Sequence, residues 1–370
     1  MSKTHFFKRE FKIDGRNIGP NHPPYVIAEL SGNHKGNLQQ ALNLIDAAAK
    51  AGADAIKIQT YTADTITLKH DGPEFCLTGG LWQGRTLYDL YQEAHTPWDW
   101  HDALFERAAQ QRIPIFSSPF DATAIDLLES LQCPAYKIAS FEITDIGLIK
   151  QATATGKPII ISTGLANLDE IEEAVQAVRD AGGKQLGLLH CISGYPTPIE
   201  DCNLNTLKDL QQRFNFPIGL SDHTIDNTAS IASVCLGASI IEKHFTIDKT
   251  DGSVDAAFSL EPEQFSRLVM EAKRAKQALG NAGYSVKPSE AGGREFRRSL
   301  YCCAALKKGQ PFTRDNVRSV RPGLGLHTRY LDDVIGKVAK SDIEFGTPLA
   351  ADMVEGLALH PRVSKSQTRP

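Results

Sequence analysis

The sequence lacks the features that mark a membrane-spanning or a disulfide-stapled protein. None of its 370 residues belongs to a run of about 18 apolar residues, the length that a membrane-spanning helix needs. The segment from Met1 to Lys8 lacks the apolar stretch of a signal peptide. The seven cysteines are odd in number and form no CxxC pair, which predicts reduced thiols. We therefore expect a cytoplasmic protein.

An excess of charge of one sign is also missing. The formal net charge is −4, from 40 lysine and arginine residues against 44 aspartate and glutamate residues. This balance offers no electrostatic footprint for nucleic acid or for an anionic membrane, so we expect neither as a partner. No GxGxxG follows the first apolar strand, which argues against a dinucleotide-binding, doubly wound sheet.

What is present is a regular alternation of short apolar strands and helices between residues 20 and 280. The helix expected over 169–181, for example, has Asn167 at its N-cap and ends at Gly182. About eight such units over about 250 residues are typical of an α/β protein with a (β/α)8 TIM barrel, and a doubly wound parallel sheet is the alternative. The strands are expected at 25–29, 55–59, 113–117, 135–138, 158–162, 186–190, 218–221 and 239–244.

The remaining segments suggest further parts. A hairpin over 11–19, turning at Asp14-Gly15, is expected to plug the bottom of the barrel. The unusually long connection 60–95 is typical of a functional lid. We therefore expect a barrel domain over 1–280 that includes the hairpin, a linker over 281–294 rich in Gly, Ser and Pro, a small domain over 295–357, and a polar, disordered tail over 358–370.

Polar residues occupy nearly every expected strand end, where TIM-barrel enzymes carry their chemistry. If the last two strands are neighbours, His223 and His244 face one pocket, and two imidazoles with open positions suit a divalent metal. The alternative is two unrelated histidines, each satisfied by its own hydrogen bonds. The strand ends include Glu29, Lys57, Gln59, Ser117, Ser118, Lys137, Ser140, Ser162, Thr163, His190, Ser221, His223, Glu242 and His244.

The lysines and serines of this set are suited to an anion, either a phosphate or a carboxylate. Lys57 and Lys137 would supply positive charge, and Ser118, Ser140 and Ser162 would supply directed donors. Snorkelling of Lys57 and helix capping by the serines are the structural alternatives. Glu29 and Glu242 are candidates for acid–base work or for orienting a lysine. A Schiff-base lysine, as in barrel aldolases, also remains open.

At these residues the chain resembles the sialic acid synthase family, whose members condense phosphoenolpyruvate with an acylamino sugar. The small domain resembles the family's antifreeze-like (SAF) domain, and Arg321-Pro322-Gly323 is its most recognisable motif. Together the likeness covers about residues 10 to 357. The matching barrel stretches are 27–34 (IAELSGNH), 56–60 (IKIQT), 117–121 (SSPFD), 136–140 (YKIAS), 161–164 (ISTG), 195–198 (YPTP), 220–224 (LSDHT) and 242–246 (EKHFT).

The resemblance implies a role for each candidate residue. His223 and His244 would bind Mn²⁺ or Mg²⁺, and Glu29, Lys57 and Glu242 would take part in the chemistry. Gln59, Tyr195 and Asp255 would contact the sugar, while Arg321 would reach its N-acyl group in a partner subunit, which implies a domain-swapped homodimer. Phosphoenolpyruvate would be held by Lys57, Ser118, Lys137, Ser140, Ser162 and Ser221.

Within the family, the chain is more similar to the branch that makes pseudaminic acid than to the one that makes N-acetylneuraminate. The stretches 80–91, 255–262 and 321–327 indicate this, and Trp82, Tyr88 and Phe258 would line a more apolar sugar pocket. Two positions depart from the family pattern: Ser193 stands where Asn is common, and Val254 where Pro is usual. The other readings are an N-acetylneuraminate or legionaminate synthase, a Schiff-base aldolase, and a sugar-binding protein built from a degenerate barrel.

Overall fold

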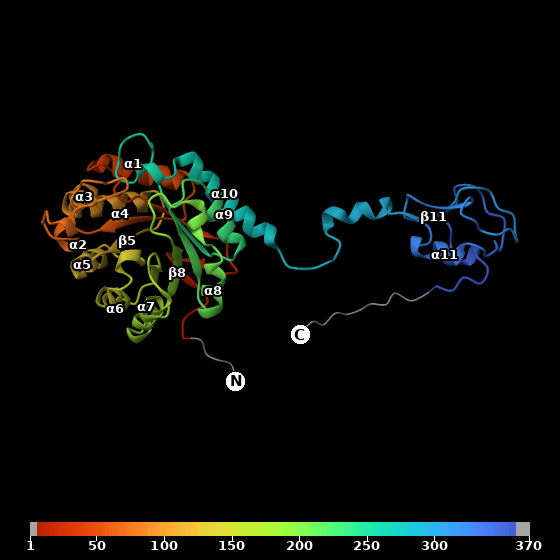
Figure 1. Ribbon diagram of the computed structural model, residues 1–370, viewed down its shortest axis with the longest axis horizontal. Coiled ribbons are helices and arrows are strands. Elements are labelled where there is room, and N and C mark those ends of the chain that lie inside the picture. The colour runs from red at the N-terminus through yellow and green to blue at the C-terminus, as the bar shows by residue number, and fades with distance from the viewer. Residues whose placement is uncertain (1–5, 360–370) are drawn as a thin grey trace. The chain divides into compact units, whose positions relative to one another are not determined.

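The computed structural model of the protein describes residues 6–359. The chain divides after Gly280 into two compact units (Figure 1), each of which is described by itself below. Most of the tail that the sequence predicts to be disordered, from residue 360 onward, lies outside the described residues.

The first unit is a closed barrel of eight parallel strands in which each strand pairs with the next and the last pairs with the first. This confirms the predicted TIM barrel. One strand starts two residues later than expected, because the Ile113 N–H still donates to Ala108 O at the end of the preceding helix. The strands are β3 (Tyr25–Glu29), β4 (Ala55–Thr60), β5 (Ile115–Pro119), β6 (Tyr136–Ile138), β7 (Ile159–Ser162), β8 (Leu186–Cys191), β9 (Ile218–Asp222) and β10 (Ile240–His244).

Helices surround this barrel (Figure 1). The expected N-cap at Asn167 is present: its side chain accepts from Glu170 N at 3.0 Å, and the Glu170 carboxylate accepts from Asn167 N at 2.8 Å. None of the described helices is long and apolar enough to cross a membrane. The main helices are α1 (Leu38–Lys50), α4 (His101–Gln110), α5 (Ala122–Ser130), α6 (Ile146–Ala154), α7 (Leu168–Asp180), α8 (Thr206–Arg213), α9 (Thr228–Cys235) and α10 (Pro262–Leu279).

Short helices lie in the connections. The long segment between β4 and α4 contains several of them, so the expected lid is an ordered layer with its own secondary structure. The short helices of this unit are α2 (Ala63–Ile66), α3 (Leu87–Ala94), η1 (Pro73–Phe75), η2 (Trp98–Trp100), η3 (Ser140–Glu142), η4 (Ile199–Cys202) and η5 (Ala256–Phe258).

The barrel is filled by apolar side chains at one end and by polar ones at the other. A hairpin of β1 (Phe11–Ile13) and β2 (Arg16–Ile18) turns at Asp14-Gly15, where both residues have positive φ. Its residues Phe11, Ile13 and Ile18 share one buried cluster with inward-facing residues of the strands. Side chains alternate along a strand, so every second residue points into the barrel. The inward residues at the carboxyl ends of the strands lie at the mouth opposite the hairpin, and these are the polar strand ends.

The second unit is a small fold around its own apolar core. Strands β11 (Ser299–Cys302) and β12 (Val317–Val320) pair antiparallel, and Leu300, Phe312, Val317 and Leu349 are among its buried residues. Part of the segment expected to be a plain linker is ordered, since η6 (Pro288–Phe296) runs through it. The other short elements are η7 (Thr328–Tyr330), α11 (Leu331–Val334) and η8 (Ala351–Met353).

Candidate active site

Two lysines and two glutamates form a buried charged cluster at the polar mouth of the barrel. Lys57 Nζ lies 2.5 Å from Glu29 Oε2 and 3.7 Å from Glu242 Oε1. Lys137 Nζ donates to the same Glu242 Oε1 at 3.0 Å. All four side chains are almost fully buried. The cluster is therefore a set of charges that compensate one another on neighbouring and facing strands.

The two carboxyl groups have different environments. Burial raises the pKa of Glu29 above its usual value, and the attraction of Lys57 only partly offsets this. Burial would also raise the pKa of Glu242, but Lys137 and Lys57 together outweigh it and lower the pKa. Two nearby carboxyl groups with separated pKa values are the pattern of an acid–base pair, in which Glu29 holds a proton more readily.

The hydroxyl groups around the cluster provide further donors. Ser118 Oγ lies 3.3 Å from Lys57 Nζ, and Ser221 Oγ lies 3.3 Å from Glu242 Oε1. Ser140 Oγ accepts from Gly164 N at 3.1 Å and is hydrogen-bonded to the Cys191 thiol. Ser162 Oγ is buried and has no hydrogen-bond partner within residues 6–359. Buried polar atoms without partners normally indicate an absent ligand or water.

His223 and His244 lie side by side at the ends of the neighbouring strands β9 and β10, with ring centroids 5.3 Å apart. His223 Nδ1 donates to Ile192 O at 2.9 Å, so Nε2 is the nitrogen that a metal would use. Burial lowers the pKa of His223, but Cys191 and the Ile192 carbonyl outweigh burial and raise it, so a metal would have to displace a proton from this ring. His244 Nδ1 is buried without a hydrogen-bond partner among the described residues. Burial, reinforced by His223, lowers the pKa of His244 well below its usual value, so the ring is neutral, as a metal ligand must be.

This pair fits a divalent cation that keeps other ligands from solvent or substrate. Within the described part of the chain, no three His, Cys, Asp or Glu side chains converge on a common metal position. The nearest carboxylate is that of Asp255, whose Oδ2 lies 3.8 Å from His244 Nδ1. Two imidazoles alone leave several coordination positions open, as a site that binds substrate through the metal requires.

A chain of hydrogen bonds connects the charged cluster to Asp255. Gln59 Nε2 donates to Glu29 Oε1 at 3.0 Å and to Ser31 Oγ at 3.2 Å, and Ser31 in turn donates to Asp255 Oδ2. Asn33 connects the Asp255 loop to the residue that follows β10. Its Nδ2 donates to Phe245 O at 2.9 Å, and its Oδ1 accepts from Asp255 N at 3.2 Å. The structure thus brings Gln59 and Asp255 together, as the sequence predicts.

Aromatic rings cover the histidines. The Tyr195 ring lies 4.4 Å from that of His223 and 5.3 Å from that of Phe258, and Phe258 lies 4.9 Å from His244. Trp82 joins them at 5.9 Å from Tyr195, and its Nε1 donates to Val254 O at 3.2 Å. The expected apolar wall is therefore present, and the departure at Val254 acts through a backbone carbonyl that any residue could supply.

Tyr88 is an exception among the predicted pocket aromatics. Its hydroxyl donates to Asp64 Oδ2 at 3.3 Å, and Lys69 Nζ lies 5.6 Å from its ring. These contacts place it in the packing between α2 and α3 instead of in the aromatic wall. The prediction for Tyr88 is wrong because the same run of lid residues supplies both inward and outward side chains.

The structure adds residues that the sequence reasoning missed. Cys191 faces inward at the end of β8, with Sγ 3.8 Å from His223 Nδ1, while His190 faces outward and contacts Cys202 O at 2.8 Å. Ser193, the other departure, has a buried hydroxyl without a hydrogen-bond partner in the part of the chain that is described. Alternation along β8 was the available signal, since it allows only one of His190 and Cys191 to face the mouth.

Glu142 is a further missed residue. It lies in η3, directly after the β6 strand end, and its Oε2 is buried with no hydrogen-bond partner in residues 6–359. Burial raises the pKa of Glu142 to about 7, against the smaller opposing effects of its own backbone N–H and Lys137. Burial raises the pKa of Tyr91 in α3, and the Glu142 carboxylate raises it further. Glu142 therefore lies beneath the lid.

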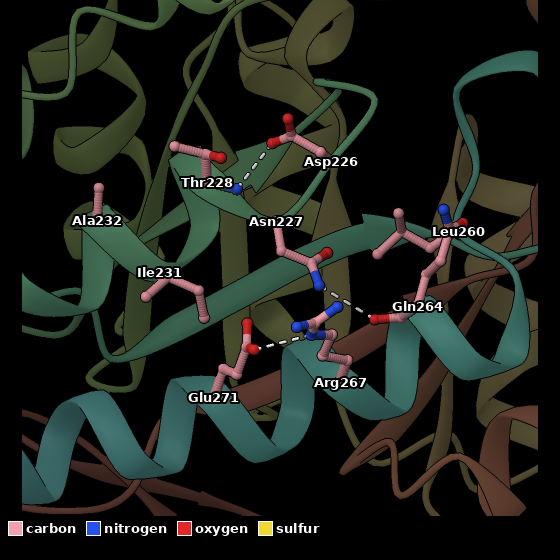
Figure 2. A pocket seen from close by; sticks show the side chains of 9 residues that line it. All are labelled: Asp226, Asn227, Thr228, Ile231, Ala232, Leu260, Gln264, Arg267 and Glu271. Atoms are coloured by element: carbon pink, nitrogen blue, oxygen red, sulfur yellow. Dashed lines mark hydrogen bonds and ion pairs between the residues drawn. The ribbon is translucent and has the colours of Figure 1, made fainter.

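Two features lie elsewhere. Arg321 is exposed in the second unit. A groove of about 610 Å³ on the outer wall of the barrel, between α9 and α10, contains none of the candidate residues (Figure 2). The chemistry therefore gathers at the mouth and not in this groove.

Comparisons with known proteins identify the family. The NeuB family matches residues 44–284, and the SAF domain matches residues 297–355. A pseudaminic acid synthase of Campylobacter jejuni subsp. jejuni serotype O:23/36 (strain 81-176) is 44% identical over 333 residues, which is 90% of this chain and 97% of the relative. A pseudaminic acid synthase of Helicobacter pylori (strain ATCC 700392 / 26695) is 42% identical over 334 residues, 90% of this chain and 98% of the relative.

A solved structure shows the same likeness. The N-acetylneuraminic acid (sialic acid) synthetase of Leptospira borgpetersenii serovar Hardjo-bovis, in complex with citrate, has a TM-score of 0.70 and 34% sequence identity. The match covers 79% of this chain and 98% of that one. Shared motifs, matching family and similar fold lead to one conclusion: the chain belongs to the NeuB family, the sialic acid synthases, and carries the SAF domain.

Proposed function

We propose that this enzyme condenses phosphoenolpyruvate with 2,4-diacetamido-2,4,6-trideoxy-L-altrose and water to give pseudaminic acid and phosphate. The observation that carries the proposal is the charged cluster beside an aromatic wall: Lys57 and Lys137 for an anion, and Tyr195, Phe258 and Trp82 for an apolar sugar. The similarity to pseudaminic acid synthases over 90% of the chain supports the choice of sugar.

Phosphoenolpyruvate would lie over the two lysines. Lys57 and Lys137 neutralise its phosphate and carboxylate, and the hydroxyls of Ser118 and Ser162 donate to them. Ser140 and Ser221, which contact Cys191 and Glu242, would join them by turning their hydroxyls to the substrate.

The pKa of Lys57 supports binding over imine formation. Burial lowers it, but Glu242 and Glu29 outweigh burial and raise it, so Lys57 is a poor nucleophile. At Lys137 burial outweighs the attraction of Glu242 and lowers the pKa, so Lys137 is the lysine at which trapping has to test for an imine.

The reaction needs a proton source at the sugar aldehyde and a base for water. As C3 of phosphoenolpyruvate bonds to the aldehyde carbon, Glu29 donates a proton to the aldehyde oxygen, which suits its raised pKa. Glu242 stays ionised beside Lys137 and accepts a proton from the water that adds at C2. The resulting tetrahedral carbon loses phosphate by cleavage of its C–O bond. Gln59 and Asp255 orient the sugar hydroxyls.

His223 and His244 would hold Mn²⁺ or Mg²⁺, as their free nitrogens permit. Such an ion, when bound, supplies Lewis-acid activation of the aldehyde and a common anchor for both reactants. The chain's own part is to keep the two rings adjacent and shielded by Tyr195 and Phe258, with His244 neutral.

The alternative substrates differ in polarity. N-acetylmannosamine carries a 6-hydroxyl that would face the aromatic wall, whereas a 6-deoxy sugar presents a methyl group to it. An apolar wall gains from the methyl and leaves the hydroxyl without a partner. A legionaminate synthase would use an equally deoxygenated sugar, so stereochemistry has to decide between the two 6-deoxy substrates.

Assembly as a domain-swapped homodimer also belongs to this proposal. Large apolar side chains are exposed on the connections that rim the mouth, and the SAF unit has exposed apolar side chains of its own. A second copy whose SAF unit rests on the rim would cover both sets and bring Arg321 to the sugar. The rim residues are Leu68, Leu81, Phe141, Leu165, Ile199, Ile225 and Ile247, and those of the SAF unit are Phe296, Leu324 and Phe345.

The test is release of phosphate from phosphoenolpyruvate with Mn²⁺, comparing 2,4-diacetamido-2,4,6-trideoxy-L-altrose, its legionaminate-type isomer and N-acetylmannosamine. The proposal expects turnover with the first sugar, with the product identified by mass and by comparison with authentic pseudaminic acid. Preference for either other sugar would overturn the choice of substrate and leave the reaction class standing. Borohydride trapping of the chain with substrate would overturn the reaction class.

A further inference from the structure

A buried ion pair lies behind the two histidines. Asp222 and Lys243 directly precede His223 and His244 and are partners in the β9–β10 ladder. Because side chains alternate, this pair points outward from the barrel wall while the histidines point inward. Lys243 Nζ lies 2.9 Å from Asp222 Oδ2, and the two side chains are 0% and 1% exposed.

The pair is bonded on every side to the turn that follows His223. Lys243 Nζ donates to Thr224 O at 2.6 Å and to Asp226 O at 2.8 Å. Asp222 Oδ1 accepts from Thr224 N at 2.9 Å, and its Oδ2 accepts from Ser230 Oγ of α9 at 2.5 Å. The residues before and after His223 are therefore both held by one buried network.

The turn is also tied down at its far end, as Figure 2 shows. The Asp226 carboxylate accepts from Thr228 N at 2.8 Å, and Asn227 Nδ2 donates to Gln264 O of α10 at 3.1 Å. The turn is thus bonded to α9 through Thr228 and to α10 through Gln264. The Lys243 ammonium of β10 bonds the same turn through Thr224 O and Asp226 O, and so sets its position relative to β10.

Stability alone does not require charges at these positions. The outward residues that precede them on the same strands, Leu220 and Ile241, are apolar and buried. Buried ion pairs are commonly replaceable by apolar residues of similar volume without loss of stability. Their value is a defined geometry, since the ammonium must direct its hydrogens at fixed acceptors.

We infer that Asp222 and Lys243 are positioning residues that hold the His223 and His244 imidazoles at the spacing needed to bind a divalent cation. The inference rests on the proposed function of the histidine pair. Neither residue touches substrate or metal; each acts through the backbone of the histidine next to it.

The test is Mn²⁺ binding to the metal-free full chain, measured by calorimetry and by the electron paramagnetic resonance signal of free Mn²⁺, without substrates. The main variant is the double change Asp222→Leu/Lys243→Met, which removes both charges together. We expect its melting temperature in chelator to fall to about that of the Leu148→Ala control, because Thr224 N, Thr224 O and Asp226 O lose their partners. Its Mn²⁺ affinity should fall about 10–100-fold, the usual cost of changes behind a ligand. Lys243→Met alone, which strands a buried carboxylate, is expected to lose both.

Leu148→Ala in α6 is the matched control, because it destabilises the barrel core by a cavity and leaves the histidine strands intact. It is expected to bind Mn²⁺ like the wild type. Wild-type affinity in the folded double variant would overturn the inference while leaving the proposed function in place. Failure of the wild type to turn over phosphoenolpyruvate, with weakened Mn²⁺ binding in the double variant, would overturn the function and leave the inference in place. No Mn²⁺ binding by the wild type would overturn both.

Discussion

Lys57 Nζ lies 2.5 Å from Glu29 Oε2 at the mouth of the barrel, on adjacent strands and almost without solvent. The pair places an ammonium group for an anionic substrate directly beside a carboxyl group with a raised pKa. Anion binding and proton transfer are thereby combined in one contact. Gln59 Nε2 donates to the other carboxyl oxygen, Glu29 Oε1, at 3.0 Å and fixes its orientation.

Glu29→Gln is expected to lower kcat by about 10²–10⁴-fold, because it removes the proton donor while keeping size and hydrogen bonding. Affinity for phosphoenolpyruvate should hold or improve, since Lys57 loses a competing carboxylate. Steady-state kinetics with calorimetry of phosphoenolpyruvate binding checks this. The control is Glu10→Gln, an exposed residue beside the hairpin. A kcat within tenfold of the wild type would rule out Glu29 as the donor.

His223→Ala and His244→Ala are expected to abolish the response to Mn²⁺. Each removes one of two protein ligands, so activity should fall by more than the roughly 10–100-fold that changes behind a ligand cost. Titration of Mn²⁺ into chelator-treated enzyme, with phosphate release as the signal, measures it. His22→Ala, near the hairpin and paired with Glu10, is the control and should respond like the wild type. An unchanged metal response in both site variants would refute the metal assignment.

Glu142 predicts a pH-dependent stability. Its pKa is about 7 in the folded chain against 4.5 for an ordinary glutamate, so the folded state holds the proton that the unfolded state releases. The associated stabilisation is present below about pH 4.5 and is lost as the pH rises through about 7, for a total of about 3 kcal/mol. Glu142→Gln should therefore gain stability relative to the wild type between about pH 5 and about pH 8.

Thermal unfolding of the metal-free protein at both pH values measures this gain. Glu172→Gln, an exposed change on α7, is the control and should show the same difference from the wild type at each pH. If the stability difference between Glu142→Gln and the wild type were also the same at both pH values, Glu142 would be ionised in the folded state at both.

Trp82→Ala tests the aromatic wall. The ring contacts Tyr195 and ties the lid to Val254 O, so its loss should raise the KM for the sugar by about tenfold and leave the KM for phosphoenolpyruvate almost unchanged. The control is the neighbouring Gln83→Ala, which removes an exposed side chain. Equal effects on both KM values would show that the lid acts by general closure and not by contact with the sugar.

The domain-swapped dimer makes a prediction about mixtures. Arg321→Ala and Glu29→Gln should each be nearly inactive, yet their hybrid dimer has one site with both native residues. Mixing equal amounts under conditions of subunit exchange should restore about a quarter of wild-type activity, because half of the dimers are hybrid and each has one complete site of two. Glu29→Gln mixed with His223→Ala, two barrel variants, should restore none. Absence of restoration in the first mixture, with exchange verified, would contradict the swap.

The barrel was predictable because its signals are local and repeated. Apolar strands such as 25–29 and a capped helix beginning after Asn167 indicate their structure from neighbouring residues alone. The polar strand ends followed from the topology, since parallel strands bring their carboxyl ends to one mouth. Lys57, Lys137, Glu29 and Glu242 therefore come together as expected.

The rest depends on which way a side chain points and on contacts distant in sequence. Alternation decides between His190 and Cys191, and lid packing turns Tyr88 toward Asp64 while Trp82 reaches Val254. Glu142 became visible only through its burial, because a single glutamate after a strand usually faces solvent. The described residues of η6 are exposed, so no burial pattern marks this helix in a segment rich in Gly, Ser and Pro.

The most direct test of the account follows the bridging oxygen of phosphoenolpyruvate. The substrate would carry oxygen-18 between C2 and phosphorus and would react with 2,4-diacetamido-2,4,6-trideoxy-L-altrose in the presence of Mn²⁺. Attack from C3, addition of water at C2 and C–O cleavage predict that the released phosphate carries the label and that the nonulosonic acid has none. Label retained in the sugar product, or no product from this sugar, would contradict the account.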